Sequence, residues 1–334
     1  MRWDIHNHVI PVQAIEQSGP KAPFKITGDH IEGAGIKFPL TPDFIDAKAK
    51  LQALTTTGLG AAIVSLAPPL FGHGLEKTEA EAWAGSVNDA MRSFCQEAPE
   101  RLRWLAHVAL QSPETLAWQL RTAIADGAVG VQIGTSLAGD CLENAELDAL
   151  WATAEELRVP ILLHPMQRGD HPLLRDWYLQ NVIGNPLETA IAVERMICAG
   201  IFTKHPDLRV VLVHGGGYLP WQLGRLRHAS KVRPEFAGST IDFDAIRQNI
   251  FVDSLTHDPA VLRVLVEQLG ADHVMLGTDA PFDMAAENPV EDLIHAVGET
   301  TGEYIMTDVP DQVFGLTDSS CSHAHPARPL VVNS

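Results

Sequence analysis

Five polar residues follow apolar stretches of the sequence and could together do metal chemistry. His6 and His8 stand one residue apart near the start, while His164, His214 and Asp279 each come at or just after a short apolar run. A lone histidine at the end of a strand is more often a hydrogen-bonding core residue than a ligand. Several imidazoles and a carboxylate in one place, however, are the donor set that zinc or a similar divalent ion accepts. The group as a whole therefore favours a metal site.

These residues need elements that bring them together, and the sequence supplies an alternation of strands and helices. Alternate residues of a strand point to one face, so both imidazoles of the histidine pair point the same way if a strand ends there. Apolar runs predict eight strands, at 3–6, 61–65, 102–108, 129–133, 161–164, 210–214, 250–253 and 273–277. Helical patterns alternate with them at 46–57, 80–95, 113–125, 145–157, 187–199, 220–229, 259–269 and 289–297. This alternation predicts an α/β fold, a (β/α)8 TIM barrel.

A barrel of this kind gathers its active site at the carboxyl ends of the strands, where the five polar residues would meet. The alternative is an open doubly wound sheet, but no GxGxxG pattern follows the first strand to support nucleotide binding. Residues 1–316 are expected to form one barrel domain, with a loop insertion after the first strand at 20–42 that is either a long loop or a small hairpin. The C-terminal tail, 317–334, is expected to be poorly ordered or to dock on a partner.

The composition narrows the choice of partners. The formal net charge is −18, from 42 acidic against 24 basic residues, which argues against nucleic-acid or anionic-membrane binding. No run approaches 18 apolar residues, and no basic segment followed by an apolar run opens the chain, so neither a transmembrane helix nor a signal peptide is expected. The four cysteines show no CxxC spacing, so a cytoplasmic location is expected rather than a disulfide framework.

Several longer motifs resemble the amidohydrolase superfamily, and within it the branch of 2-amino-3-carboxymuconate 6-semialdehyde decarboxylase and related aromatic acid decarboxylases. They are DIHNHVIP, LAPPLFGHG, GVQIGTSLAG, LLHP, VLVHGGGYLPWQLGRLRHA, FVDS and VMLGTDAPF. The resemblance implies one Zn²⁺ ion, or another divalent ion such as Mn²⁺, held by His6, His8, His164 and Asp279, with a water completing the shell. It also implies that His214, beside that water, and Asp279 are catalytic, and that the protein is a homodimer. The predicted fourth strand has Gln132 near its end and offers no lysine to bridge a second metal.

The substrate side departs from the family pattern. An arginine expected in the loop after the first strand is absent, and Lys37 and Phe38 stand there. A lysine can pair with a carboxylate without the bidentate fork of arginine, although a solvated loop charge is an equal alternative. The residue after His-Pro is Met166 where the family often has tryptophan. The full set of expected substrate-binding residues is Lys37, Phe71, His73, Met166, Arg168, Trp177 and Phe282.

The preferred interpretation is non-oxidative decarboxylation of a small aromatic or muconate-type carboxylic acid. A metal-dependent hydrolase or hydratase acting on an amide, ester, lactone or C–C bond could use the same site. A barrel that only binds or serves as a scaffold is a third alternative. Asp4, two residues before His6, is expected to orient a ligand histidine.

Overall fold

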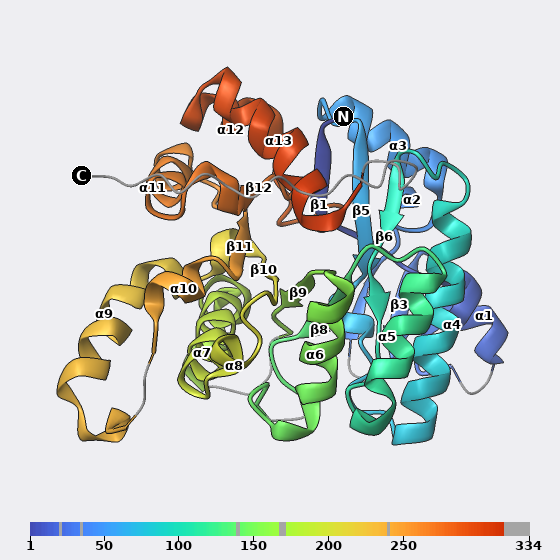
Figure 1. Cartoon of the computed structure of the whole chain (residues 1–334). Helices are drawn as coiled ribbons and strands as arrows, with labels where there is room; N and C mark the ends of the chain where they lie inside the picture. The colour runs from blue at the N-terminus through green and yellow to red at the C-terminus, as the bar shows by residue number, and fades with distance from the viewer. Residues whose placement is uncertain (20–21, 34–35, 138–140, 167–171, 239–240, 317–334) are drawn as a thin grey trace.

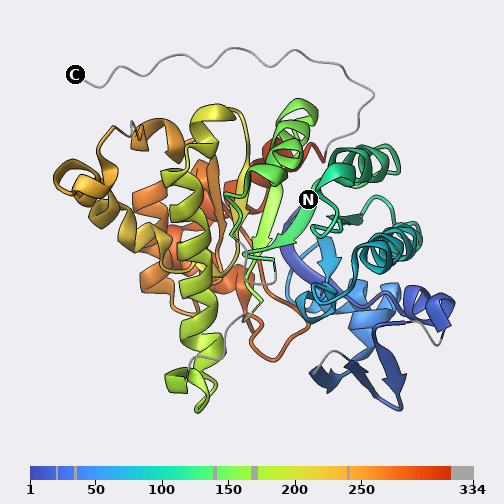
Figure 2. The same ribbon diagram turned by 90° about the horizontal axis from the view of Figure 1, so that it is seen from below.

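The computed structural model describes residues 1–19, 22–33, 36–137, 141–166, 172–238 and 241–316. The predicted tail, 317–334, therefore lies outside the described residues. Within them, parallel strands form a barrel with helices packed around it (Figures 1 and 2).

The barrel is built from nine short parallel strands. They fill the eight strand positions of the barrel, because two of them are halves of one strand. The strands are β1 (Trp3–Val9), β5 (Ala61–Leu66), β6 (Leu102–Trp104), β7 (Ala106–His107), β8 (Val131–Gly134), β9 (Ile161–His164), β10 (Val210–Leu212), β11 (Ile250–Asp253) and β12 (Val274–Met275). β6 pairs with β5 and β7 pairs with β8, and only Leu105 separates the two halves. All eight predicted strands are present, with ends that differ by a few residues.

The barrel closes between the first and last strands. The amide of Ile5 donates to the carbonyl of Leu276 at 2.9 Å, and the amide of His8 donates to the carbonyl of Ala280 at 2.8 Å. A closed ring has no free sheet edge, so the open doubly wound alternative does not apply. The structure confirms the TIM barrel expected from the sequence.

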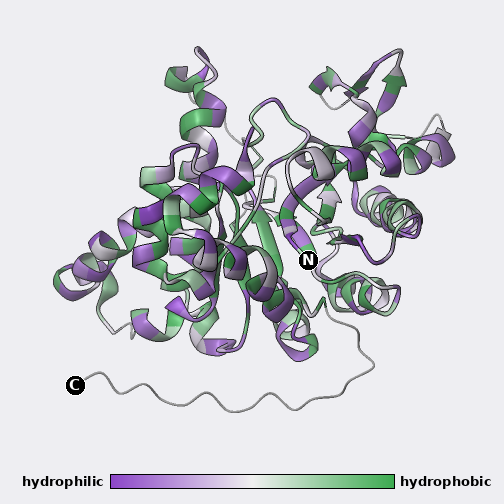
Figure 3. Ribbon diagram, turned by 90° about the horizontal axis from the view of Figure 1, so that it is seen from above, coloured by the Kyte–Doolittle hydropathy of each residue, from purple (hydrophilic) through white to green (hydrophobic). Residues whose placement is uncertain are grey.

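Helices alternate with the strands and cover the barrel. They are α1 (Val12–Ser18), α2 (Pro42–Ile45), α3 (Ala47–Thr56), α4 (Lys77–Cys95), α5 (Leu116–Ala125), α6 (Asp148–Leu157), α7 (Asn185–Cys198), α8 (Ile201–Lys204), α9 (Leu219–Val232), α10 (Phe243–Arg247), α11 (Pro259–Leu269), α12 (Pro289–Val297) and α13 (Glu299–Phe314). Asp258 caps the start of α11, because its side chain accepts hydrogen bonds from the amides of Ala260 and Val261. Strands at the centre are mostly hydrophobic, while the surrounding helices mix both classes (Figure 3).

The last helix, α13, is absent from the sequence prediction. It packs on the barrel interior, where Val309, Val313 and Phe314 join a cluster with strand residues such as Ile5 and Met275. Gly302 and Pro310 lie within this helix and lower its intrinsic helix propensity. Burial of its apolar face overrides that local preference.

The insertion after the first strand, expected to be a long loop or a small hairpin, folds into a small antiparallel sheet of three strands. Its strands are β2 (Lys25–Thr27), β3 (His30–Gly33) and β4 (Ile36–Pro39). This sheet projects beyond the ring of barrel strands (Figure 2). In β4, Ile36 and Phe38 are partly buried while Lys37, between them, is exposed. This alternation decides which side chains of the insertion turn toward the rest of the molecule.

Candidate metal centre and active site

The structure brings four of the predicted residues into one buried cluster at the carboxyl ends of the strands. Donor atoms of His6, His8, His164 and Asp279 all lie within 4.8 Å of one another. The Oδ1 atom of Asp279 is 3.2 Å from Nε2 of His6, 3.0 Å from Nε2 of His8 and 4.0 Å from Nε2 of His164. Three ring nitrogens thus face one carboxylate oxygen.

A bulge in β1 makes this arrangement compatible with the barrel core. Asp4 pairs with Ala62 and Asn7 pairs with Val64, so β1 advances by three residues where β5 advances by two. The extra residue changes which side of the strand faces inward. Ile5 therefore packs in the hydrophobic cluster inside the barrel, and the next residue, His6, still reaches the cluster of His8, His164 and Asp279.

Asp253, at the end of β11, holds His6 and the turn that follows β10 in one arrangement. Its Oδ2 atom lies 2.7 Å from Nδ1 of His6 and also accepts the amide of His214 at 2.9 Å. Its Oδ1 atom accepts the amides of Gly215 at 2.6 Å and Leu255 at 3.1 Å. With a proton on Nδ1 shared with Asp253, His6 presents the lone pair of Nε2 to the cluster.

The other two rings are oriented in the same way. Nδ1 of His8 lies 3.1 Å from Oγ of Ser65, whose hydroxyl donates to the carbonyl of Asn7 and can therefore accept from the ring. Nδ1 of His164 lies 2.7 Å from the carbonyl oxygen of Pro165. Each ring thus has an acceptor for its Nδ1 proton, and its Nε2 atom points into the cluster.

The electrostatics of the cluster suit a cation. Burial lowers the pKa of His8 to about 3 and that of His164 to about 4, so both rings are neutral at pH 7. Burial also opposes the charged form of His6, but the carboxylates of Asp279 and Asp253 outweigh it and raise the pKa to about 10. Burial disfavours the Asp279 carboxylate, yet the neighbouring histidines hold its pKa well below the ordinary value. A divalent ion can replace the His6 proton between the two carboxylates.

Within the part of the chain that the structure describes, two buried ring nitrogens of the cluster also lack a hydrogen-bonding partner. These are Nε2 of His6 and Nε2 of His164, both aimed at the space beside Asp279. Buried nitrogens without partners are costly unless something occupies the space they face. The donor set, its burial and these two atoms fit a divalent metal ion.

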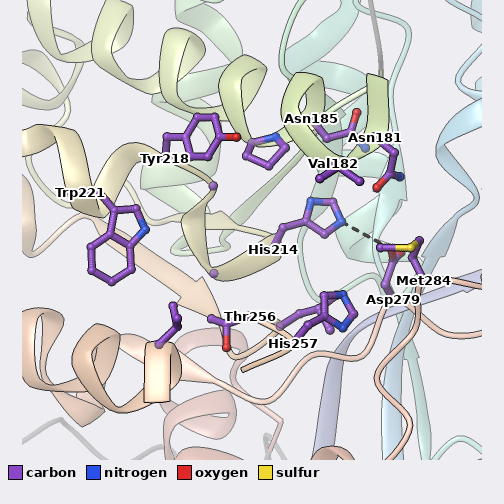
Figure 4. A pocket seen from close by; sticks show the side chains of 15 residues that line it. Asn181, Val182, Asn185, His214, Tyr218, Trp221, Thr256, His257, Asp279 and Met284 are labelled. Carbon is purple, nitrogen blue, oxygen red and sulfur yellow. Dashed lines mark ion pairs between the residues drawn. The ribbon is translucent and has the colours of Figure 1, made fainter. Parts of the chain in front are cut away.

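His214 lies beside this cluster and connects it to a cavity. Its Nε2 atom is 3.4 Å from Oδ2 of Asp279, and its ring centroid is 5.2 Å from those of His6 and His164 (Figure 4). Its φ angle is 56°, in the left-handed region that few residues other than glycine adopt. This strained backbone turns the ring back toward the cluster.

The glycines after His214 let the chain pass close to α7. A Cβ atom on Gly217, whose φ is 60°, would lie 2.6 Å from the carbonyl oxygen of Pro186. That carbonyl accepts the amide of Tyr218 at 3.2 Å. The start of α7 is thereby held against the His214 turn.

A cavity with two lobes opens beside the cluster, and both lobes share Asn181, Asn185, His214, Asp279 and Met284. The first lobe, of about 390 Å³, is also lined by Ile36, Pro68, Pro69, Pro165, Met166, Tyr178, Phe282 and Asp283. The second, of about 260 Å³, extends toward Tyr218, Trp221, Thr256 and His257 (Figure 4). These volumes suit a small organic molecule.

The expected substrate-binding residues separate in the structure. Met166 and Phe282 line the first lobe. Lys37 is exposed on β4, and its neighbour Ile36 lines the lobe in its place. Trp177 has 89% of its surface exposed, so the structure does not bring it to the cavity.

Two further expected residues, Phe71 and His73, lie elsewhere. Phe71 is buried and its ring stacks on His107 with centroids 5.7 Å apart. His73 is buried against β8, where a Cβ atom on Gly134 would lie 2.6 Å from its ring. Neither lines the two lobes beside His214 in the described part of the chain. Arg168 lies outside the described residues.

Asp4 does hold a ligand histidine, but through the main chain of His6 and not through its ring. Its carboxylate accepts the amide of His6 at 3.1 Å, the side-chain amide of Asn7 at 2.7 Å and the hydroxyl of Thr278 at 2.6 Å. It therefore fixes the backbone of β1 against the segment before Asp279 and contacts no ligand ring. The reason is the bulge, which turns Asp4 away from the face that the two histidines occupy.

Sequence reasoning missed three residues that position the cluster: Ser65, Asp253 and Lys50. Lys50 is buried in α3, and its ammonium group donates to Oδ1 of Asn7 at 2.5 Å and to the carbonyl of His8 at 2.9 Å. Burial lowers its pKa to about 8. Asp253 ends a predicted strand, which could have signalled it, but nothing in the local sequence distinguishes Lys50 from a surface lysine.

Comparisons with known proteins agree with this architecture. A family described as Amidohydrolase matches residues 3–301. The chain is 27% identical over 335 residues to 2-amino-3-carboxymuconate-6-semialdehyde decarboxylase of Dictyostelium discoideum, covering 95% of this chain and 92% of that protein. It is 30% identical to gamma-resorcylate decarboxylase of Rhodococcus jostii (strain RHA1), covering 70% of this chain and 77% of that protein.

Solved structures share the fold. The crystal structure of dihydroxybenzoic acid decarboxylase from Polaromonas sp. JS666, with bound manganese and the inhibitor 2-nitroresorcinol, superposes with a TM-score of 0.77 at 21% identity, covering 95% of this chain and 98% of that chain. The structure of 5-carboxyvanillate decarboxylase from Sphingomonas paucimobilis gives 0.76 at 21% identity, covering 95% and 99%. No described helix is both long and apolar enough to cross a membrane. With nearly all of its barrel matched by the family, the chain belongs to the amidohydrolase family.

Proposed function

We propose that this protein is a metal-dependent decarboxylase that removes CO2, without oxidation, from a small aromatic or muconate-type carboxylic acid. The single observation that carries the proposal is the set of His6, His8, His164 and Asp279, whose donor atoms face one buried point. The relatives named above support the reaction, because decarboxylase is the activity in each of their names. The proposed ion is one Zn²⁺ per chain, with Mn²⁺ as the alternative that a structural relative contains.

A bound divalent ion would supply Lewis-acid stabilisation of negative charge on the substrate oxygens. The residues of the chain supply position and protons. Pro68, Pro69, Met166 and Phe282 form an apolar wall that can hold a flat ring and exclude water. His214 lines the same lobe as that wall, and its Nε2 atom lies 3.4 Å from Oδ2 of Asp279.

The proposed reaction consumes one proton and releases one CO2. Nε2 of His214, paired with Asp279, delivers the proton to the ring carbon that bears the carboxylate. That carbon becomes tetrahedral, and the bond to the carboxylate then breaks. The electron pair of this bond restores the unsaturated system, and CO2 leaves. Asp279 stabilises the protonated imidazole before the transfer.

Hydrolysis or hydration on the same site is the alternative function. It would use the same cluster, but the named relatives favour decarboxylation. Product mass separates the two reactions, since decarboxylation removes the mass of CO2 and hydration adds the mass of water.

The test is CO2 release by purified protein loaded with Zn²⁺ or Mn²⁺. The panel comprises hydroxybenzoates, pyrocatechuates and aminocarboxymuconate semialdehyde, with product masses measured in parallel. Release of CO2 from at least one acid supports the proposal. Water addition to panel members without CO2 release would replace it with the alternative.

We further propose a homodimer in the cytoplasm. Large apolar side chains are exposed on and before α7: Leu173, Trp177, Tyr178, Val182, Ile183, Leu187 and Ile191. Exposed apolar groups of this extent are typical of an interface. Cys95, Cys141 and Cys198 are free thiols, which suits a reducing compartment. Sedimentation equilibrium tests the dimer, and a single species of monomer mass would contradict it.

A further inference from the structure

The hydroxyl of Tyr178 is a free hydrogen-bonding group in the wall of the first lobe. Tyr178 lines that lobe together with His164 and Asp279 of the metal cluster, and 54% of its surface is exposed. Among the described residues, none forms a hydrogen bond with this hydroxyl. A molecule bound in the lobe can therefore reach it.

An unusual turn of the main chain fixes the position of Tyr178. Trp177 and Tyr178 have φ angles of 59° and 60°, so two successive residues other than glycine adopt the left-handed conformation. The carbonyl of Tyr178 accepts the amides of Asn181 at 3.0 Å and Val182 at 3.1 Å, at the start of a π-helical turn, η6 (Gln180–Gly184). Strained backbone and π-helical turns are both frequent at functional sites.

This turn gives two adjacent aromatic side chains different surroundings. Tyr178 lines the first lobe, whereas Trp177 is 89% exposed and lies outside the cavity. The pair therefore separates the effect of the turn itself from the effect of a group that faces the lobe.

The surroundings of the Tyr178 hydroxyl favour its role as a donor. Burial and the nearby carboxylates of Asp283 and Asp279 raise the pKa of Tyr178 above its ordinary value. The phenol is therefore protonated at neutral pH and can donate its proton to an acceptor. Because both carboxylates act on its charge, the hydroxyl lies on the side of the lobe that holds the metal cluster.

The lining of the cavity has little else to offer to the carboxylate of an acid. None of the described residues that line the two lobes is lysine or arginine. The apolar wall of Pro68, Pro69, Met166 and Phe282 has no side-chain donor. A carboxylate that leaves water for this lobe needs hydrogen bonds from neutral side chains, and the hydroxyl of Tyr178 can supply one.

Resting on the decarboxylase function proposed above, we propose that Tyr178 is a substrate-binding residue whose hydroxyl donates a hydrogen bond to the carboxylate of the substrate. A neutral phenol here serves where an arginine or lysine commonly pairs with a carboxylate. The charge that accepts this hydrogen bond disappears as CO2 leaves, so the bond stabilises the bound acid at least as strongly as the transition state. Loss of the hydroxyl should therefore raise KM without lowering kcat.

The experiment compares the wild type with Tyr178→Phe, which removes only the hydroxyl and keeps the ring. The matched control is Trp177→Phe, in the same strained turn but outside the cavity. Isothermal titration calorimetry of the Zn²⁺-loaded proteins measures the Kd of 2,6-dihydroxybenzoate and of 2-nitroresorcinol. The nitro group has the shape of a carboxylate but carries no net charge, so it is a weaker acceptor.

We expect Tyr178→Phe to weaken binding of 2,6-dihydroxybenzoate at least about tenfold, which is the loss of one hydrogen bond to a charged group, and to leave 2-nitroresorcinol within about threefold. Trp177→Phe should bind both ligands as the wild type does. Equal weakening of both ligands in Tyr178→Phe would indicate a structural role and overturn the proposal. Unchanged binding of 2,6-dihydroxybenzoate in Tyr178→Phe, or a wild type that does not bind it, would also overturn it.

Binding and turnover fail separately in this design, because CO2 release is measured on the same samples. Selective weakening of 2,6-dihydroxybenzoate, in a wild type that releases CO2 from no acid of the panel, would leave the role of Tyr178 in carboxylate binding standing and remove the decarboxylase function. CO2 release with unchanged binding in Tyr178→Phe would do the reverse. A lower kcat at unchanged KM in Tyr178→Phe would likewise contradict a binding role.

Discussion

The metal cluster and the substrate cavity share one face of the barrel, yet they are built in different ways. The cluster uses residues at strand ends, and each of its three rings has a partner that orients Nδ1. The cavity is walled by parts that lie far apart in sequence, including Ile36 of the small sheet, Tyr178 near α7 and the segment around Met284. Strand ends are fixed by the register of the barrel, whereas loops and insertions are free to vary. The cluster is therefore the part of the site that the sequence predicts best.

Removal of a cluster residue should break the site most completely. We expect His164→Ala to lose most of its bound metal and at least about 1000-fold of the CO2 release, because one of the four donors of the site is lost. Metal content by mass spectrometry and the CO2 assay check this. The matched control is His228→Ala, an exposed histidine of α9, which should keep both. Full metal content in His164→Ala would contradict the assignment of that ligand.

Buried polar residues of the barrel strands also make the free energy of unfolding depend on pH. His107 on β7 is the example. Burial lowers its pKa to about 4, against 6.5 for an exposed histidine. Between these two pH values the histidine is therefore protonated in the unfolded chain and neutral in the folded chain. The stability that the neutral His107 provides is fully present above pH 6.5 and is lost as the pH falls toward 4. The free energy of unfolding decreases by about 3 kcal/mol over this range.

Urea unfolding of the wild type and His107→Gln at pH 7 and pH 4 isolates this effect from the other titrating groups. The wild type should lose about 3 kcal/mol more stability than the variant between the two pH values. The same pH dependence in both proteins would contradict the assignment.

A substitution at Asp253 tests whether the metal-binding side chains are positioned by residues that contact them without binding the metal. Asp253→Asn keeps the size of the side chain but can no longer accept hydrogen bonds at both oxygens from His6, His214 and Gly215. We expect metal affinity to fall by about 10- to 100-fold. Competition with a chelator measures it. An unchanged affinity would show that the strand ends alone position His6.

The smallest expected effect concerns the cavity, where neighbouring residues of β4 make a matched pair. Ile36 lines the first lobe, so Ile36→Ala should raise KM by about three- to tenfold through lost apolar contact. Lys37 points to solvent, and Lys37→Ala should change KM by less than about twofold. Steady-state kinetics with the best acid of the panel compares them. The reverse order would restore Lys37 as a substrate residue.

The elements were predictable to different degrees for physical reasons. Strands buried on both faces appear as continuous apolar runs, and all eight were found in the sequence. Helix α13 was not, because Gly302 and Pro310 obscure it and its stability comes from packing against the barrel. The insertion after β1 was expected as a loop or small hairpin, and the sheet it forms became clear only with its partners in place.

The amino-acid order is enough to predict the barrel and the residue types that gather at its end, because strand periodicity and the alternation of strands and helices are properties of the chain. Which neighbouring side chains orient those residues depends on contacts that form only in the folded protein. The tertiary structure showed that Asp253 and Lys50 support the cluster from β11 and α3. It also showed that Ile36, one residue from Lys37, reaches the cavity. These choices depend on a one-residue register and on contacts between distant segments, which local sequence does not encode.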